Sequence, residues 1–308
     1  MSLRRNGARI RKALEVCDLA TASQQLVRNS PPLRVLGLDV NTNSTGFAIV
    51  TEHGRLCRWG SISTAHIASS SVLDIGATVD DFLATVQDAE EHQDPAAQWI
   101  VGIEAFMRMF RPGRFHNAGM FQLAQLNGIV SFACWKRFHA VPIHTHPSAA
   151  RGFFGLSTSS GRSKEGSIKH QVMAFLQEHE AEAVEDTVDR SDALPTLERT
   201  RTGALADSAF DIADAYVIAA YTRCVYLQKQ LEVQDPDQVV QFTTRYLDLT
   251  YEAAAKTKKS SREGKLLKDM EEKERKRYMR DLYAFGVAKW VKEHHDTCFQ
   301  VPPQDEPT

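Results

Sequence analysis

A bare apolar run from Trp99 to Ile103 (WIVGI) constrains the fold of this 308-residue chain more than any other segment. The run has no alternation of polar and apolar residues, which is typical of a central strand buried on both faces of a sheet. A sheet with such a strand needs helices on both faces, so the run favours an α/β fold. Glu104 follows directly and places a carboxylate at the end of this strand.

Further elements are expected on both sides of the apolar run. Short strands are indicated at 33–38, 46–51, 56–63 and 140–144. Apolar residues recur at helical spacing in 72–89, 118–138, 168–179 and 208–230. This order, with a meander before the crossovers, predicts a mixed five-stranded sheet flanked by helices on both faces.

Breaks in the pattern suggest the domain organisation. Residues 1–32 are Arg-rich and acid-poor, which resembles an organelle transit segment; a basic or disordered arm is the alternative. Residues 33–230 form the α/β domain, with a flexible acidic insert at 180–202. Residues 231–308 form a mainly helical, charged C-terminal extension, either a clamp on nucleic acid or a partner, or a solvated accessory region. We expect the matrix of a mitochondrion or other organelle, and otherwise an intracellular location.

The composition is that of a globular protein, with 43% hydrophobic and 25% charged residues. No apolar run is long enough to span a bilayer, so no membrane partner is expected. The five cysteines are scattered and lack metal-ligand spacing, as expected in a reducing compartment. The net charge of −2 conceals a basic stretch at 99–175 interleaved with phenylalanines. That pattern suits a phosphate-rich polymer, although basic blocks are more often solvated faces.

Four carboxylates stand where a metal site can form. Asp39 ends the first strand, Glu104 ends the fourth, and Asp211 and Asp214 lie one turn apart on the last helix of the domain. If the two strands are neighbours and the helix packs across them, the acids meet, and their repulsion requires cations. Two Mg²⁺ ions would supply that charge, suit carboxylate ligands and serve phosphodiester hydrolysis. A single strand-end Asp, by contrast, is more often a turn residue or a helix cap.

Four sequence motifs occur in a fixed order. They are LDVNTNSTGFA at 38–48; IEAF at 103–106 followed by FQLAQLNG at 121–128; PSAARGFFG at 147–155 followed by KHQV at 169–172; and DIADAYVIA at 211–219. Together they resemble the RuvC-like Holliday junction resolvases of the RNase H-like (retroviral integrase) superfamily, over residues 35 to 223. Val40-Asn41 and Arg151 depart from the family, which often has Pro-Gly and Lys there, and Phe106 lies one position before the family's wedge aromatic.

The resemblance implies an RNase H-like fold and a role for each matching residue. The implied metal ligands are Asp39, Glu104, Asp211 and Asp214, which together with Lys169 form the implied catalytic set. The residues expected to bind nucleic acid are Phe106, Arg108, Arg111, Arg114, Arg151 and Lys164. The implied cofactor is Mg²⁺, two ions per site, with Mn²⁺ as a substitute.

The implied activity is that of a structure-selective endonuclease that resolves four-way DNA junctions by paired symmetric nicks. Its partners would be branched DNA, with RNA not excluded, and a second copy of the chain, bound along helix 118–138.

Two rival functions remain open. One is a nucleic-acid-binding RNase H-like subunit of a large mitochondrial ribonucleoprotein, in which the extensions hold partners and catalysis is weak or absent. The other is an actin-like ATPase, since that fold also opens with an Asp and a Thr/Gly turn. The ATPase predicts a second Asp-Gly phosphate loop, which the sequence does not offer.

Overall fold

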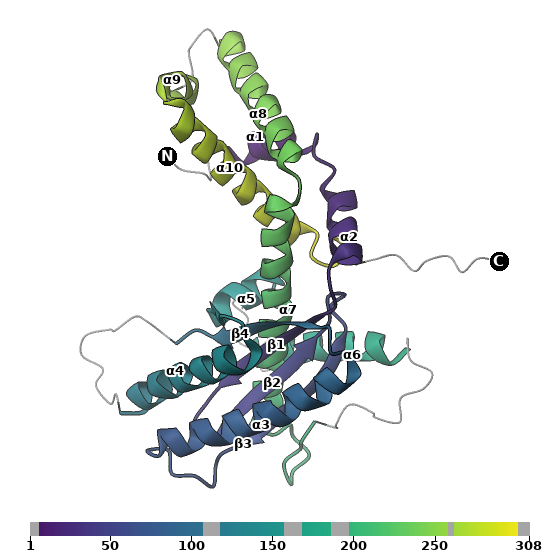
Figure 1. The fold of residues 1–308 in the computed structure, drawn as a ribbon, viewed down its shortest axis with the longest axis vertical. Helices are drawn as coiled ribbons and strands as arrows, with labels where there is room; N and C mark the ends of the chain where they lie inside the picture. The colour runs from purple at the N-terminus through teal and green to yellow at the C-terminus, as the bar shows by residue number, and fades with distance from the viewer. Residues whose placement is uncertain (1–5, 107–117, 157–167, 186–196, 258–261, 301–308) are drawn as a thin grey trace, which may run out of the picture. The chain divides into compact units, whose positions relative to one another are not determined.

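The computed structural model describes residues 6–106, 118–156, 168–185, 197–257 and 262–300 (Figure 1). The chain divides into two compact units. One is Ser30–Arg223, and the other joins Met1–Asn29 with Cys224–Thr308.

In the described residues, the first unit is built on a five-stranded sheet of order β3-β2-β1-β4-β5. The strands are β1 (Leu33–Val40), β2 (Ser44–Val50), β3 (Leu56–Ser63), β4 (Gln98–Glu104) and β5 (Ile143–Thr145). β1 pairs antiparallel with β2 and parallel with β4. β1 therefore joins the antiparallel part of the sheet (β1–β3) to the parallel part (β1, β4 and β5). The apolar run of β4 is buried throughout, as expected for an inner strand.

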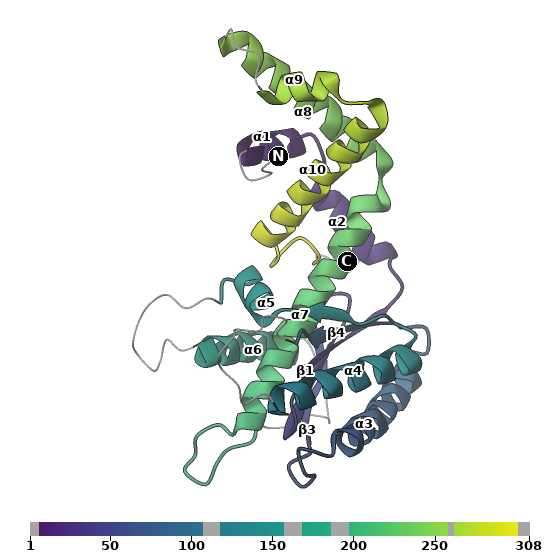
Figure 2. The ribbon, with the colours of Figure 1, turned by 90° about the vertical axis from the view of Figure 1, so that its left-hand side faces the viewer.

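Helices α3 (Val72–Gln93) and α4 (Ala118–Phe138) lie side by side on one face of the sheet (Figures 1 and 2). They share a core with the strand side chains that point to this face, among them Leu36 and Leu38 of β1. Because side chains alternate along a strand, the intervening Gly37 and Asp39 point to the other face.

Helix α7 (Asp207–Gln234) covers that other face, and two strand glycines allow its close approach. A Cβ on Gly37 would overlap the backbone of Ala215, and a Cβ on Gly46 would overlap the backbone of Asp211. α7 therefore rests directly on the backbone of β1 and β2, on the face toward which Asp39 points.

Two further helices join α7 on this face through aromatic contacts. They are α5 (Pro147–Phe153) and α6 (Ile168–Glu185). The ring of Phe175 in α6 lies 5.7 Å from Tyr216 of α7 and 4.9 Å from Phe154, the residue that caps α5. These rings fix the two helices that carry the basic residues of the candidate site.

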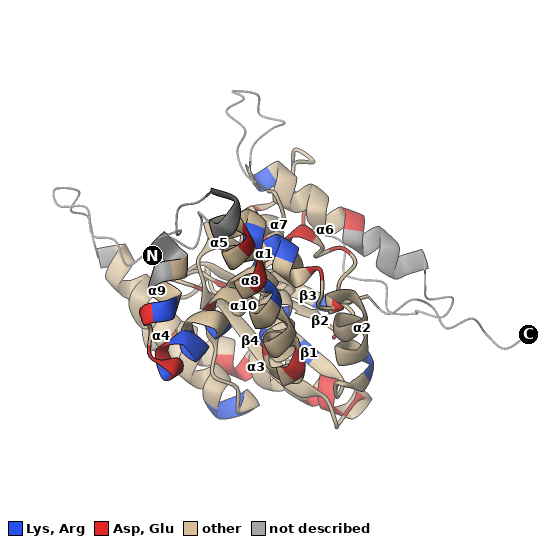
Figure 3. Ribbon diagram, turned by 90° about the horizontal axis from the view of Figure 1, so that it is seen from above, with Lys and Arg blue, Asp and Glu red and all other residues tan. Residues whose placement is uncertain are grey.

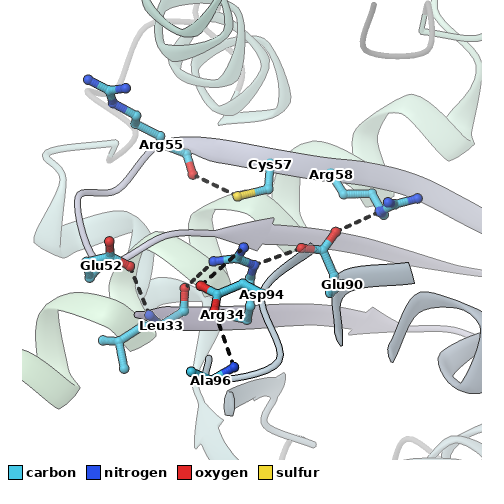
Figure 4. A network of polar contacts seen from close by, with 9 residues as sticks. All are labelled: Leu33, Arg34, Glu52, Arg55, Cys57, Arg58, Glu90, Asp94 and Ala96. Carbon is cyan, nitrogen blue, oxygen red and sulfur yellow. Dashed lines mark hydrogen bonds and ion pairs between the residues drawn. The ribbon is translucent and has the colours of Figure 1, made fainter. Parts of the chain in front are cut away.

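A buried ionic network ties the end of α3 to the sheet (Figure 4). Glu90 is 2% exposed, and each of its carboxylate oxygens accepts a hydrogen bond. The donors are Arg34 Nε at 2.7 Å, from the start of β1, and Arg58 Nε at 3.0 Å, from β3. A buried carboxylate paired in this way offsets its loss of hydration. The network lies at the end of β1 opposite Asp39.

The second unit is a helical bundle formed by both ends of the chain. It contains α1 (Gly7–Leu14), α2 (Leu19–Asn29), α8 (Pro236–Thr257), α9 (Arg262–Asp269), α10 (Glu272–Glu293) and the last part of α7. Ile10 and Leu14 of α1 pack on Gly286 of α10, where a Cβ would overlap both side chains. Its basic and acidic residues are interspersed (Figure 3), with pairs such as Lys276–Glu272 at 2.6 Å. The basic N-terminal segment and the C-terminal extension are thus parts of one folded unit.

The expected architecture is confirmed: a mixed five-stranded sheet, helices on both faces and a helical C-terminal extension. Some local expectations need correction. The segment 180–202 is not irregular throughout, because α6 continues to Glu185 and Arg199 forms a β-bridge with Leu205. The last strand begins only at Ile143, after Pro142, which has no N–H to donate to a ladder.

In the charged C-terminal extension, α9 ends at Asp269 and α10 begins at Glu272, so the two are separate helices. Among the described residues, no helix combines the length and hydropathy that a membrane span requires.

Candidate active site

The structure brings together the four carboxylates that the sequence placed at element ends. Leu38 of β1 is paired with Ile103 of β4 in a parallel register, so Asp39, the last residue but one of β1, and Glu104, the last residue of β4, lie at the same end of neighbouring strands. α7 crosses the strands there and carries Asp211 and Asp214. Charge interactions link Asp39 to the other three acids. The prediction that these strands are neighbours with the helix packed across them is confirmed.

Asp39 is the most buried of the four acids, at 4% exposure. Burial raises its pKa well above the usual value of 3.8, and a hydrogen bond and charge interaction with Glu104 raise this pKa further. Its Oδ1 atom is buried and has no hydrogen-bond partner in the part of the chain that the structure describes. A buried acceptor of this kind costs free energy until a proton or cation satisfies it.

Asp211 is held by a residue that the sequence analysis did not assign to the site. The hydroxyl of Ser44, at the start of β2, donates a short hydrogen bond to Asp211 Oδ2. Burial raises the pKa of Asp211, while the Ser44 hydroxyl lowers it. Gly46 lies two residues further along β2, and its missing side chain lets the backbone of Asp211 sit against the strand. Ser44 therefore positions the carboxylate of Asp211, and Gly46 allows the close approach of its backbone.

Asp214 is paired with Arg151 of α5. Two guanidinium nitrogens donate to the same carboxylate oxygen, Oδ1: Nη2 at 2.7 Å and Nε at 3.2 Å. Burial raises the pKa of Asp214, while Arg151 lowers it. Arg151 lies in the last turn of a short helix that begins with His146 as N-cap and Pro147 at its first position. Such a start is favoured, because Pro is tolerated in the first turn of a helix.

Lys169, near the start of α6, lies at the rim of the acidic cluster. Its Nζ is 3.8 Å from Asp207 Oδ1 and 4.9 Å from the centroid of the Phe210 ring. Its charge also lowers the pKa values of Asp211 and Asp214. The side chain is 62% exposed, so it can move toward a bound phosphate.

A second residue without an assigned role is Asn127 of α4. It is 8% exposed and its Nδ2 donates a hydrogen bond of 2.8 Å to the backbone oxygen of Glu104. Asn127 therefore fixes the end of β4 that carries the acid. Asn127 could have been noticed in the sequence, because it is a polar residue on the apolar face of α4, next to the buried Leu126.

The donor set fits a hard divalent cation, because it consists of carboxylate oxygens and includes the unsatisfied Oδ1 of Asp39. Two of the acids are already engaged, Asp211 by Ser44 and Asp214 by Arg151. Within the described ranges, no three acidic, His or Cys side chains form a ready-made cage around one point.

The residues expected to bind nucleic acid are only partly described. Phe106 follows the end of β4 and is half-buried, and Arg151 lies within the acidic cluster. The other four, Arg108, Arg111, Arg114 and Lys164, lie outside the described residues.

Comparisons with known proteins gave matches among solved structures. Neither a protein-family model nor a curated protein matches the chain. T. thermophilus RuvC in complex with a Holliday junction substrate is 15% identical over 65% of this chain and 97% of its own, with a TM-score of 0.36. The yeast mitochondrial Holliday junction resolvase Ydc2 is 14% identical over 72% of this chain and 95% of its own, with a TM-score of 0.38. Both identities are low, and the assignment of site residues rests on the contacts of this chain.

Proposed function

We propose that the protein is a Mg²⁺-dependent, structure-selective endonuclease that resolves four-way DNA junctions by paired symmetric nicks. The observation that carries the proposal is the cluster of Asp39, Glu104, Asp211 and Asp214, in which the buried Oδ1 of Asp39 has no partner among the described residues. Four carboxylates on two strand ends and one helix form an electronegative centre that a cation would neutralise. The order of the four sequence motifs supports the proposal that the substrate is a four-way DNA junction.

Each residue has a proposed task in phosphodiester hydrolysis. The four acids would hold two Mg²⁺ ions, and Mn²⁺ could replace them because it also prefers oxygen ligands. When bound, the ions would lower the pKa of water and stabilise charge on the attacking and leaving oxygens. Ser44 and Asn127 would keep the acids in place, and the exposed ammonium group of Lys169 would approach the phosphoryl oxygens.

A symmetric pair of nicks requires two copies of the site, so we propose a homodimer. α4 offers a suitable surface, the α4 stripe, which consists of Phe121, Gln125, Gly128, Phe132 and Trp135. All five are exposed in the single chain and alternate at spacings of four and three residues, as in a coiled-coil seam. The rings of Phe132 and Trp135 lie 5.8 Å apart, and the side chains are 61% and 51% exposed.

Nicking of a synthetic four-way DNA junction in Mg²⁺ tests the proposed activity. The expected result is paired symmetric nicks in the junction, but not in matched linear duplex or RNA. Asp39→Asn and Asp214→Asn should abolish nicking while junction binding survives, because each removes a cation ligand and leaves the DNA-binding surface intact. Loss of junction binding in a folded Asp39→Asn protein would contradict the role given to this acid.

An inactive protein would point to the rival function. If the folded wild type nicks no DNA or RNA substrate in Mg²⁺ or Mn²⁺, the endonuclease proposal fails. A nucleic-acid-binding subunit of a ribonucleoprotein then becomes the better explanation of the fold.

A further inference from the structure

The pairing of Arg151 with Asp214 bears on how the site accepts a cation. Both guanidinium donors converge on Oδ1, at 2.7 and 3.2 Å, so the arginine occupies one oxygen of this carboxylate. A Mg²⁺ ion needs a carboxylate oxygen at about 2.0 to 2.1 Å. A guanidinium and a divalent cation on the same oxygen would repel each other at close range. Arg151 and a cation are therefore competitors for Asp214.

The surroundings of Arg151 allow its side chain to leave while its backbone stays. The neighbouring Phe153 is buried, and its ring lies 5.3 Å from Tyr221 of α7 and 5.0 Å from Phe154. These contacts anchor α5. The Arg151 side chain itself is 25% exposed, so its long stem has a route toward solvent.

We propose that Arg151 is a displaceable counter-ion: it neutralises Asp214 in the metal-free protein, the first divalent cation expels it, and the freed guanidinium then binds a phosphate of the nucleic acid. This inference rests on the proposed cation site and deepens the proposed function. It makes metal loading and nucleic-acid binding cooperative, because a phosphate that holds Arg151 also uncovers Asp214. Such coupling is reciprocal, so the metal strengthens nucleic-acid binding by the same factor.

The chain offers a matched control arginine. Arg137 of α4 also places two nitrogens on one oxygen, Asp80 Oδ1 of α3, at 3.0 and 2.7 Å. In both pairs the arginine donates through Nε and Nη2, and the two arginine side chains are similarly exposed, at 23% and 25%. The Arg137 pair, however, joins two helices on the other face of the sheet, so it tests the effect of losing an arginine without touching the acidic cluster.

The first measurement is binding of Mn²⁺ to the DNA-free, full-length protein, followed by electron paramagnetic resonance or calorimetry. Arg151→Gln should bind Mn²⁺ about tenfold more tightly than the wild type, because its competitor is gone. Arg151→Lys should give an intermediate affinity, since the charge remains but the two-point contact is lost. Arg137→Gln should leave the affinity unchanged. Circular dichroism of each variant confirms that the fold is intact. Unchanged or weaker Mn²⁺ binding by folded Arg151→Gln would overturn the proposal.

The second measurement tests the coupling. An uncleavable four-way junction should raise the Mn²⁺ affinity of the wild type, and the increase should disappear in Arg151→Gln. An increase of equal size in both proteins would overturn the coupling. These readouts separate the two proposals. If the wild type cuts no substrate but Arg151→Gln binds Mn²⁺ more tightly than the wild type, the counter-ion proposal stands and the endonuclease proposal fails. If the wild type cuts junctions but Arg151→Gln does not bind Mn²⁺ more tightly, the endonuclease proposal stands and the counter-ion proposal fails.

Discussion

At the scale of single residues, each acid of the cluster has its own partner in the metal-free protein. Asp39 shares a hydrogen bond with Glu104, Asp211 accepts one from Ser44, and Asp214 accepts from Arg151. The desolvation of these carboxylates raises the pKa values of all three aspartates. Ser44 and Arg151 stabilise the charged forms of Asp211 and Asp214, and a cation bound as proposed would have to compete with these two groups.

Asp39 should make the stability of the metal-free protein depend on pH. Its folded pKa lies above 3.8, so the folded state keeps a proton that the unfolded chain releases. Stability contributed by this group is therefore lost as pH rises from the unfolded value through the raised one. Asp39→Asn should remove that loss and stabilise the protein near neutral pH by about 1 to 3 kcal/mol, the cost of an unsatisfied buried group.

Urea unfolding in a chelator at about pH 5 and about pH 7.5 measures this difference. Asp81→Asn, at an exposed position on α3, is the control and should unfold like the wild type at both pH values. Parallel pH dependence in the wild type and Asp39→Asn would show that Asp39 does not carry the effect.

Ser44 should matter for the chemistry although it is not one of the four acids. Its hydroxyl holds Asp211 Oδ2, and Ser44→Ala would leave that carboxylate free to turn away. Loss of such a supporting contact typically costs about 10- to 100-fold in metal affinity or activity. Junction nicking at rising Mg²⁺ concentrations should show a higher Mg²⁺ requirement. Thr85→Ala, an exposed hydroxyl on α3, should have no effect. Equal Mg²⁺ curves for Ser44→Ala and the wild type would remove Ser44 from the site.

At the scale of elements, the position of α7 depends on small residues in the strands. A Cβ at Gly46 would overlap the backbone of Asp211, and neither side is a flexible side chain that can yield. Gly46→Ala should therefore destabilise the protein by about 1 to 3 kcal/mol, through the cost of overpacking. Because the clash falls on the helix that carries two acids, nicking should fall as well.

Gly119→Ala is the matched control for this prediction. Gly119 lies near the start of α4, and an added Cβ there meets no described residue within 4 Å. The change should stabilise the protein slightly, by up to about 1 kcal/mol, because Ala is the better helix former. The measurements are the denaturant midpoints and the nicking rates of both variants. A Gly46→Ala protein as stable and as active as the wild type would rule out the close contact between Gly46 and the backbone of Asp211.

Some parts of the fold can be predicted from short stretches of the sequence, and others cannot. The ranges 56–63 and 118–138 coincide with β3 and α4, because alternation and helical spacing are local signals. The four acids were also found locally, at the ends of elements. Ser44 was not assigned, because its task depends on a helix that follows 167 residues later. α5 was not predicted as a helix, because seven residues between Pro147 and Phe153 carry too few turns to show periodicity.

At the scale of the whole molecule, the second unit could not be recognised from either chain end alone. The N-terminal segment was expected as an arm or transit segment, yet α1 buries Ile10, Ala13 and Leu14 in the bundle. Their partners lie in α8 and α10, more than 200 residues away, so neither segment shows the complementary surface. The roughly 30 N-terminal residues contribute core side chains to this unit, and their loss would expose its apolar interior.

The final prediction concerns the assembly of two molecules through the α4 stripe. Phe121 and Trp135 each lie seven residues from Gly128, and an added Cβ at Gly128 meets no atom of the described residues within 4 Å. Two antiparallel α4 helices that cross at Gly128 would bring Phe121 of one copy opposite Trp135 of the other, and the absent side chain would allow a close crossing. The stripe is thus self-complementary, as a two-fold interface must be.

Phe132→Glu should convert the dimer to a monomer, because the charge would be buried against an aromatic surface. Light scattering after size exclusion, at micromolar protein, measures the change in mass. Leu73→Glu, at a residue that is 75% exposed near the start of α3, should leave the dimer intact. If monomeric Phe132→Glu still binds a junction but nicks it on one strand at a time, paired cutting depends on the dimer. A wild type that is monomeric with and without a junction would exclude the α4 interface and, with it, the symmetric pair of nicks.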